Sequence, residues 1–340
     1  MMDATSIPDL LPNGRVIREP VGSKPGYWAG APGVFYCAEE KGWYLTYRIR
    51  RPRGVAPDRG GEARIARSTD LEKWDDVWSV TKAQFGSTSI ERCFLCQTPD
   101  DRWRYFVSYV DAADGRWCVS VLEAGEISKL DPAKGIPLFK APALGLEGVK
   151  DPWIFHSSGK YFMFLSVALR VPQTSSQSHS THDIYNTGDC VSATGLATSS
   201  NLIDWEWQRV VFSGAGVPSA SAGGTAWDQY CRRINSVLPY GDKFLAFYDG
   251  SSSHTENYEE KTGLAVSSDL LTWQSLTPNA PLWTSPHGSG SLRYLDASLS
   301  GEQMFLFYEF ARPDGAHDLR VVRSSIEALD SLMDRSAESR

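Results

Sequence analysis

Short apolar strands separated by polar turns recur along the whole chain in a fixed order. An apolar run is followed by a tight turn, an aromatic-rich run such as GWYLTYRI at 42–49, a loop and a third run. Short runs of this kind, with no helical periodicity between them, predict antiparallel β-sheets. The unit occurs five times, with its first strand expected at 33–38, 90–97, 151–156, 233–239 and 291–297.

These units repeat at intervals of about sixty residues, which is a signature of repeat architectures. One interval is longer because it contains a Ser-, Thr- and His-rich stretch at 172–190, which predicts a long loop. The regular step predicts a five-bladed β-propeller, an all-β fold in one domain covering 1–340, whereas β-sandwiches require no such step. The blades are expected at 28–80, 88–140, 148–213, 228–280 and 286–323.

The two ends of the chain are expected to close and cap this ring. RVIR at 15–18 predicts an outer strand on the last blade. Ser324 and Glu327 are spaced as in a capping box, and apolar residues at helical spacing follow them. This pattern predicts a short C-terminal helix at 324–336.

Composition and charge exclude several classes of function. The chain has 34 Lys+Arg and 41 Asp+Glu, a net charge of −7, and no long basic run, so nucleic-acid and anionic-membrane binding are not expected. No apolar stretch is long enough to span a membrane, and the N-terminus does not resemble a signal peptide, so we expect a cytoplasmic protein. The six cysteines are expected to be buried and unpaired.

In a propeller, the starts of the first strands and the ends of the second strands meet at one mouth of the central channel, where we expect the functional site. Carboxylates expected there as catalytic groups are Asp151, Glu91, Asp228 and Asp249. Side chains expected to bind substrate are the basic Arg92, Arg232, Arg233 and His287, the carboxylate Glu309, and the aromatic Trp28, Trp153 and Trp227. Guanidinium groups in one funnel predict a site for an anionic group such as a phosphate or a uronate.

Each of these assignments has a structural alternative. Asp151 could cap the entry of its strand, and Glu91 could pair with neighbouring arginines. The basic residues could equally form a buried lattice with carboxylates that holds the blades together. His179, His182 and Asp183 spell H-S-T-H-D, but nothing fixes them as metal ligands, so a polar lid loop is the favoured interpretation and no metal is predicted.

Several motifs resemble a known superfamily. VKDPWIF at 149–155, followed by GKYF at 159–162, resembles a blade start of the five-bladed-propeller glycosidases, which include family 43, the invertase-like families and the mannoside phosphorylases. SDLLTW at 268–273 and the PHGS motif at 286–289 are similar to further elements of that group. The resemblance implies that Asp151 orients the substrate and tunes the acid. It places the general base at Ala31 and the general acid at Arg232, and neither side chain can fill that role.

Together these features predict a carbohydrate-active enzyme that cleaves or transfers a glycosidic bond with inversion, as a hydrolase or as a phosphorylase. The acid would be Glu91 or a fourth-blade carboxylate, Asp228 or Asp249. No cofactor is required, although a phosphate or a cation could bind in the funnel, and the partner is a small-molecule or oligosaccharide substrate. Two alternatives remain open: a sugar-binding propeller without catalysis, and a repurposed propeller enzyme that performs non-hydrolytic chemistry on an acidic small molecule.

Overall fold

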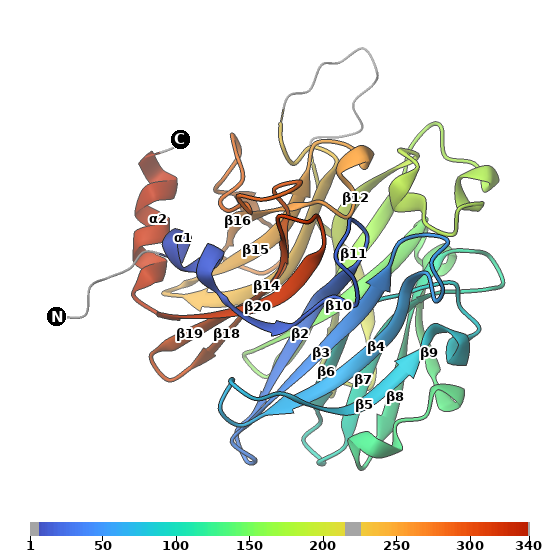
Figure 1. The fold of residues 1–340 in the computed structure, drawn as a ribbon, viewed down its shortest axis with the longest axis horizontal. Helices are drawn as coiled ribbons and strands as arrows, with labels where there is room; N and C mark the ends of the chain where they lie inside the picture. The colour runs from blue at the N-terminus through green and yellow to red at the C-terminus, as the bar shows by residue number, and fades with distance from the viewer. Residues whose placement is uncertain (1–6, 215–225, 339–340) are drawn as a thin grey trace.

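The computed structural model describes residues 7–214 and 226–338, and most of its regular structure is β-strand, so the all-β prediction is confirmed (Figure 1). The described strands form five groups, and within each group strands that are neighbours in the sequence pair antiparallel. The first group contains β2 (Trp28–Cys37), β3 (Gly42–Arg51), β4 (Arg59–Ser68) and β5 (Asp75–Thr81). The second contains β6 (Ile90–Gln97), β7 (Trp103–Val110), β8 (Trp117–Ala124) and β9 (Ile136–Lys140).

The remaining strands repeat this arrangement. The third group contains β10 (Gly148–Ser157), β11 (Lys160–Arg170), β12 (Cys190–Ser199) and β13 (Glu206–Phe212). The fourth contains β14 (Cys231–Tyr240), β15 (Lys243–Ser251), β16 (Lys261–Ser267) and β17 (Gln274–Ser275). The fifth contains β18 (Leu292–Ser300), β19 (Gln303–Ala311), β20 (His317–Ser325) and, from the other end of the chain, β1 (Arg15–Arg18), which pairs with β20 as predicted.

The first strands of the groups lie against one another around a common axis. β2 contacts β6, β6 contacts β10, β10 contacts β14, β14 contacts β18, and β18 contacts β2. Each of these strands has a register shift near its beginning. Such bulges redirect side chains, and here they occur where the five strands meet.

Three of these bulges contain a residue in the left-handed region of backbone space. Ala31, Asp151 and Tyr294 have φ angles of 54°, 56° and 51°. They occupy the same place in the strand register, directly after Gly30, Lys150 and Arg293. This conformation costs a residue with a side chain about 1–2 kcal/mol, so the fold has to impose it.

Two short helices pack at one edge of the molecule, where the chain ends meet (Figure 1). Apolar side chains of α1 (Ile7–Leu10) and α2 (Ala328–Glu338) share one buried cluster with β19. The C-terminal helix begins later than position 324 because Ser324 and Ser325 still pair with β19 in the sheet.

A turn motif repeats after the third strand of three groups. Asp70 accepts hydrogen bonds from the backbone N–H groups of Glu72 and Lys73, and the Trp74 indole donates to the Leu71 carbonyl. Equivalent bonds form at 201–205 and 269–273. The motif therefore seats a tryptophan against the sheet in each case.

Short 3-10 helices lie in the connections: η1 (Leu11–Asn13), η2 (Lys82–Phe85), η3 (Ile127–Lys129), η4 (Pro132–Lys134), η5 (Ala141–Leu144), η6 (Ser176–His179), η7 (Ile184–Asn186) and η8 (His254–Glu256).

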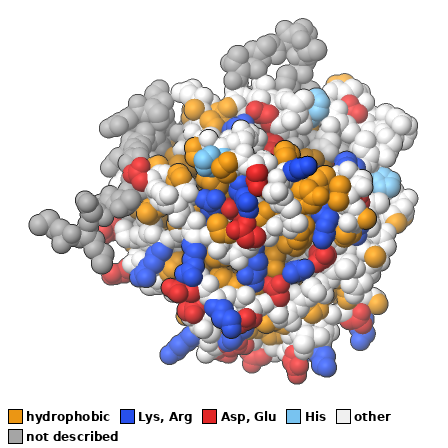
Figure 2. All heavy atoms as spheres, viewed as in Figure 1, with side chains coloured by type: hydrophobic (Ala, Val, Ile, Leu, Met, Phe, Trp, Pro, Cys, Tyr) orange, Lys and Arg blue, Asp and Glu red, His pale blue; other side chains and the backbone are white. Residues whose placement is uncertain are grey.

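All six cysteines are buried and free, as expected from the sequence. Within 7–214 and 226–338, no helix is long and apolar enough to cross a bilayer. On the face seen in Figure 2, acidic and basic side chains are interspersed.

Candidate functional site

Charged side chains from all five groups of strands meet where the first strands begin. Each is 4% exposed or less. They comprise five cations and five carboxylates, which we call the central cluster: Arg48, Arg50, Lys150, Arg233, Arg293, Glu91, Asp151, Asp249, Glu260 and Glu309. Because desolvating ten charges is costly, their mutual arrangement decides what the site can do.

One half of the central cluster is a continuous chain of ion pairs between the fourth and fifth groups. Arg233 donates to Glu260. Arg293 donates from Nη1 to Glu260 Oε2 at 2.8 Å, and from Nη2 and Nε to Glu309 Oε1 at 2.7 and 2.9 Å. Arg233 Nη2 also lies 3.9 Å from Asp249 Oδ2. These pairs join neighbouring sheets.

The other half continues this chain through the first and second groups. Arg48 lies 3.6 Å from Glu309, and its Nε donates to Glu91 Oε2 at 2.6 Å. Arg50 Nη1 lies 3.6 Å from Glu91 Oε1, and the Tyr294 hydroxyl donates to Glu91 Oε2 at 3.4 Å. Glu91 is therefore held by the arginines, which is the structural alternative that its sequence position left open.

Most of the carboxylates in the central cluster are ionised. Burial opposes ionisation of Glu91, but Arg48, Lys150 and Arg50 outweigh it and lower its pKa to about 2. Burial of Glu260 is likewise outweighed by Arg233 and Arg293, which lower its pKa to about 2. A carboxylate with so low a pKa is a poor proton donor at neutral pH.

Asp249 differs from these groups. Its Oδ1 accepts hydrogen bonds from the Asn235 amide at 2.6 Å and from the Tyr294 backbone N–H at 2.9 Å. Its Oδ2 has no hydrogen-bond partner among the described residues. Burial raises the pKa of Asp249 to about 7 despite the nearby Arg233. Asp249 can therefore hold a proton at neutral pH and release it.

Asp151 presents a second unpartnered carboxylate oxygen. Its backbone N–H donates to Ser108 Oγ at 2.7 Å, and its Oδ1 accepts a hydrogen bond from the Arg92 backbone N–H at 3.3 Å. Its Oδ2 lies 3.7 Å from Lys150 Nζ and has no hydrogen-bond partner among the described residues. Oδ1 is thus held by a hydrogen bond, whereas Oδ2 is available to accept a hydrogen bond from a ligand.

Arg92 joins strands across the axis. Its guanidinium donates to the Pro32 carbonyl at 2.6 Å, the Asn235 carbonyl at 2.9 Å and Asp296 Oδ2 at 3.1 Å. The Trp153 indole donates to the same Asp296 oxygen at 3.1 Å. Arg92 and Trp153, both expected to bind substrate, are occupied by these contacts.

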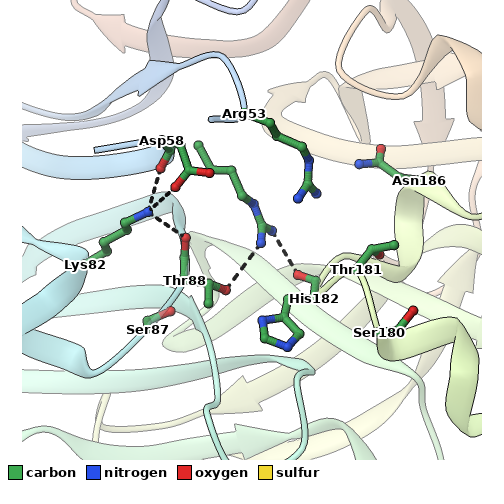
Figure 3. A pocket seen from close by; sticks show the side chains of 10 residues that line it. Arg53, Asp58, Lys82, Ser87, Thr88, Ser180, Thr181, His182 and Asn186 are labelled. Carbon is green, nitrogen blue, oxygen red and sulfur yellow. Dashed lines mark hydrogen bonds and ion pairs between the residues drawn. The ribbon is translucent and has the colours of Figure 1, made fainter. Parts of the chain in front are cut away.

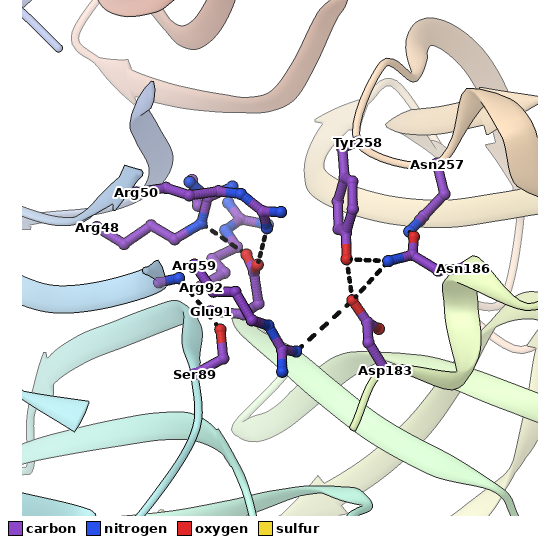
Figure 4. Close-up of polar contacts among 12 residues, drawn as sticks. Arg48, Arg50, Arg59, Ser89, Glu91, Arg92, Asp183, Asn186, Asn257 and Tyr258 are labelled. Atoms are coloured by element: carbon purple, nitrogen blue, oxygen red, sulfur yellow. Dashed lines mark hydrogen bonds and ion pairs between the residues drawn. The ribbon is translucent and has the colours of Figure 1, made fainter. Parts of the chain in front are cut away.

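The central cluster is covered by residues from two loops (Figure 4). Asp183 accepts hydrogen bonds from the Tyr258 hydroxyl and, at 3.3 Å, from the Asn186 amide. Asn257 donates to Asn186. The Tyr258 ring lies over the Arg50 guanidinium, with 4.1 Å between the guanidinium carbon and the ring centroid. We call these four residues, Asp183, Asn186, Asn257 and Tyr258, the cover.

Trp28 lies within this arrangement rather than on an open surface. It is 3% exposed and stacks on His317, with ring centroids 4.8 Å apart. The guanidinium carbons of Arg50 and Arg293 lie 4.5 and 4.9 Å from its ring centroid. His317 Nδ1 donates to the ionised Glu309 carboxylate at 2.8 Å, and Trp28 is held between this histidine and the arginines.

Asp228, Arg232 and Trp227 lie outside the central cluster, contrary to the expected convergence. Arg232 forms a bidentate pair with Asp228 at 2.9 and 3.0 Å, and the Tyr248 hydroxyl donates to Asp228 at 2.7 Å. Trp227 stacks on Tyr248 and donates to the Thr277 carbonyl. His287 lies apart as well, half-buried against the edge of Phe310. Successive residues of a strand face opposite sides, so Arg233 reaches the axis and Arg232 does not.

Sequence reasoning missed Arg50, Tyr294 and His317 as members of the site. Arg50 could have been found from Arg48, because residues two apart on a strand share a face. Tyr294 follows Arg293 as Asp151 follows Lys150, so the repeat itself marks it. The pairing of His317 with Glu309 has no signal in the local sequence.

No family model matches the chain, and no curated protein matches it. Several solved structures, however, have a similar fold. A thermostable family-43 glycoside hydrolase is 15% identical, with a TM-score of 0.59 over 90% of this chain and 92% of that one. The β-1,2-mannobiose phosphorylase from Listeria innocua, in complex with β-1,2-mannobiose, is 13% identical, with a TM-score of 0.60 over 95% of both chains. The GH43_1 enzyme from Xanthomonas citri, complexed with xylotriose, is 12% identical, with a TM-score of 0.59 over 91% and 89%.

The chain shares the fold of these enzymes. At identities of 12–15%, the likeness concerns the fold and leaves the chemistry to be argued from the site. The residues that resemblance would place in catalysis are partly replaced here, because Ala31 and Arg232 carry no carboxylate. In the central cluster, the carboxylate oxygens without a hydrogen-bond partner among the described residues are Oδ2 of Asp151 and Oδ2 of Asp249.

Proposed function

We propose that this chain is a five-bladed propeller enzyme that cleaves or transfers a glycosidic bond in the central cluster. The observation that carries the proposal is the pair of buried carboxylate oxygens without hydrogen-bond partners among the described residues, Oδ2 of Asp151 and Oδ2 of Asp249. Buried polar atoms are usually satisfied, so these two oxygens, together with guanidinium nitrogens of Arg48, Arg50 and Arg233 that also lack partners in the described part of the chain, suit the polar groups of a ligand.

Asp249 is the proposed general acid. A carboxyl group with a pKa of about 7 can donate its proton to the glycosidic oxygen as the bond to the anomeric carbon breaks. Asp151 is proposed to hold the substrate or the attacking nucleophile through its open oxygen. Inverting glycoside cleavage requires two carboxyl groups, one that donates a proton and one that acts on the nucleophile.

Glu91 and Asp228 are less suited to proton donation. The pKa of Glu91 is about 2, and Asp228 is bound by Arg232 and Tyr248 away from the axis. Of the four carboxylates considered from the sequence, Asp249 best suits the acid and Asp151 the substrate-facing role.

The charges at the centre do not favour an anionic group there. Five cations face five carboxylates, so the cluster is balanced when Asp249 is ionised, and protonation of Asp249, whose pKa is about 7, leaves at most one positive charge uncompensated. A neutral sugar ring bound through hydroxyls fits such a balanced cluster better than a phosphate does. We therefore place hydrolysis ahead of phosphorolysis.

A panel of aryl glycosides, each assayed with and without phosphate, tests this proposal. Turnover without phosphate supports hydrolysis, and NMR of the first product then shows whether the anomeric configuration is inverted. Turnover that requires phosphate identifies a phosphorylase. A sugar that raises the melting temperature without turnover identifies a binding protein, and turnover of a non-sugar acid alone identifies the repurposed enzyme.

A further inference from the structure

A cavity of about 730 Å³ lies beside the cover, between the start of β4, the entry to β6 and the loop before β12 (Figure 3). Its lining includes the cations Arg53, Arg59 and Lys82 and a single carboxylate, Asp58. We call it the entrance pocket. Hydroxyl groups of Ser87, Thr88, Ser180 and Thr181 complete much of its polar lining.

The three cations are not equally occupied. Lys82 Nζ donates to Asp58 Oδ1 and to the Asp58 carbonyl, both at 2.7 Å, so this pair is neutral and self-contained. Arg53 is exposed and forms no ion pair with any other described residue. In Figure 3 its guanidinium extends into the space opposite Thr181 and Asn186.

Arg59 is the second cation available to a ligand. It is 3% exposed, and its guanidinium donates to Thr88 Oγ1 at 3.3 Å and to the His182 carbonyl at 2.9 Å. Its Nε has no hydrogen-bond partner among the described residues. Burial lowers the pKa of Arg59; Asp183 and Tyr258 oppose this effect, whereas the neighbouring charges of Arg53 and Arg50 add to it. A bound anion would relieve that crowding of positive charge.

We propose that the entrance pocket binds an anionic group, a carboxylate, phosphate or sulfate, through Arg53 and Arg59 with support from the hydroxyls of Thr88 and Thr181. The planar guanidinium fork suits the paired oxygens of such groups. The central cluster pairs its arginines with carboxylates, whereas the entrance pocket leaves Arg53 unpaired within the described residues.

The position of the entrance pocket indicates what carries the anion. Arg59 Nη2 lies 3.8 Å from Asp183 Oδ2, and Asp183 also binds Tyr258, which covers Arg50. A ligand in the pocket therefore lies next to the cover, whose Asn186 is part of the pocket lining. This step rests on the proposed function: if a glycosidic bond reacts in the central cluster, the anion is a substituent of the same carbohydrate, bound outside the reacting unit.

Isothermal titration of the full chain with sodium sulfate, sodium phosphate, glucuronate and glucose, at one ionic strength held by NaCl, tests the site. We expect saturable binding of at least one anion and none of glucose. Arg53→Glu should weaken that binding about tenfold or more, because it replaces an attraction by a repulsion. Arg15→Glu, the same change at an exposed arginine on β1, should leave it unchanged. Arg59→Lys, which keeps the charge and loses the fork, should also weaken it.

The outcomes are separable. Binding of glucuronate without sulfate or phosphate assigns a uronate, and the reverse assigns a phosphorylated or sulfated sugar; both support the site. Absence of saturable anion binding, or equal weakening by Arg53→Glu and Arg15→Glu, overturns it. If an anion binds but no glycoside is turned over, the proposed function fails while the anion site stands.

Discussion

The central cluster and the entrance pocket both adjoin the cover, and they use arginine in opposite ways. In the centre, five cations and five carboxylates are all 4% exposed or less and are linked into chains of ion pairs. In the pocket, Arg53 is exposed and unpaired within the described residues. Burial forces pairing, since an isolated buried charge is costly, and solvent removes that requirement. The exceptions to this rule point to ligand sites. Within the described residues, they are the unpartnered carboxylate oxygens of Asp151 and Asp249 in the centre and the unpaired Arg53 in the pocket.

The largest effect is expected from removing the proposed acid. Asp249→Asn keeps an Oδ1 that can accept hydrogen bonds from Asn235 and Tyr294. Because Asp249 is neutral at pH below about 7, the neutral amide also keeps the charge of the buried group while removing its acidic proton. We expect turnover to fall about 10²–10⁴-fold, as for other general acids, with the melting temperature nearly unchanged. Steady-state kinetics and thermal unfolding provide both values.

Asp228→Asn is the matched control in the same group of strands. Asp228 is buried but pairs with Arg232 and Tyr248, so its loss should lower the free energy of unfolding by about 1–3 kcal/mol and leave turnover intact at a permissive temperature. If Asp228→Asn abolished turnover and Asp249→Asn did not, the assignment of the acid would be wrong.

The next largest effect concerns the ion pairs themselves. Arg293→Leu leaves Glu260 and Glu309 buried with one partner fewer, and breaking a buried pair costs about 3–5 kcal/mol. Arg15→Leu removes an exposed pair with Glu72 and should cost less than about 1 kcal/mol. Urea unfolding of both variants measures the difference, and similar midpoints would contradict a cluster that joins the sheets.

A smaller effect is expected at the cover between the two regions. Tyr258→Phe removes the hydroxyl that donates to Asp183. Loss of this hydrogen bond should destabilise the closed cover by about 1 kcal/mol and so raise the population of an open cover roughly fivefold. If the cover has to open for substrate, KM should fall by up to about fivefold with kcat nearly constant. A higher KM would instead mean that Tyr258 contacts the substrate.

Much of the fold could be predicted from the sequence because its signals are local. Strand periodicity and the composition of the turns depend on near neighbours, and they were enough to reveal the regular step of the repeat. The paired strand β1 followed from the same pattern.

The site was harder to predict because it depends on register and on partners distant in sequence. A shift of one residue turns a side chain to the other face of a strand, which separates Arg233 at the axis from Arg232 beside Asp228. The ion pair of Arg48 with Glu91 and the bond from Trp153 to Asp296 join residues of different groups. Composition predicted many charges, but only the structure assigns their partners.

The measurement closest to the central claim is the titration of the Asp249 side chain. Carbon-detected NMR of labelled aspartate carboxyls, in the wild-type chain and in Asp249→Asn, isolates its signal by difference. Because burial outweighs the pull of Arg233, the account predicts a midpoint near pH 7, with Asp249 protonated below it. A midpoint near 4 would mean an ordinary ionised carboxylate at neutral pH, and the assignment of Asp249 as the proton donor would be contradicted.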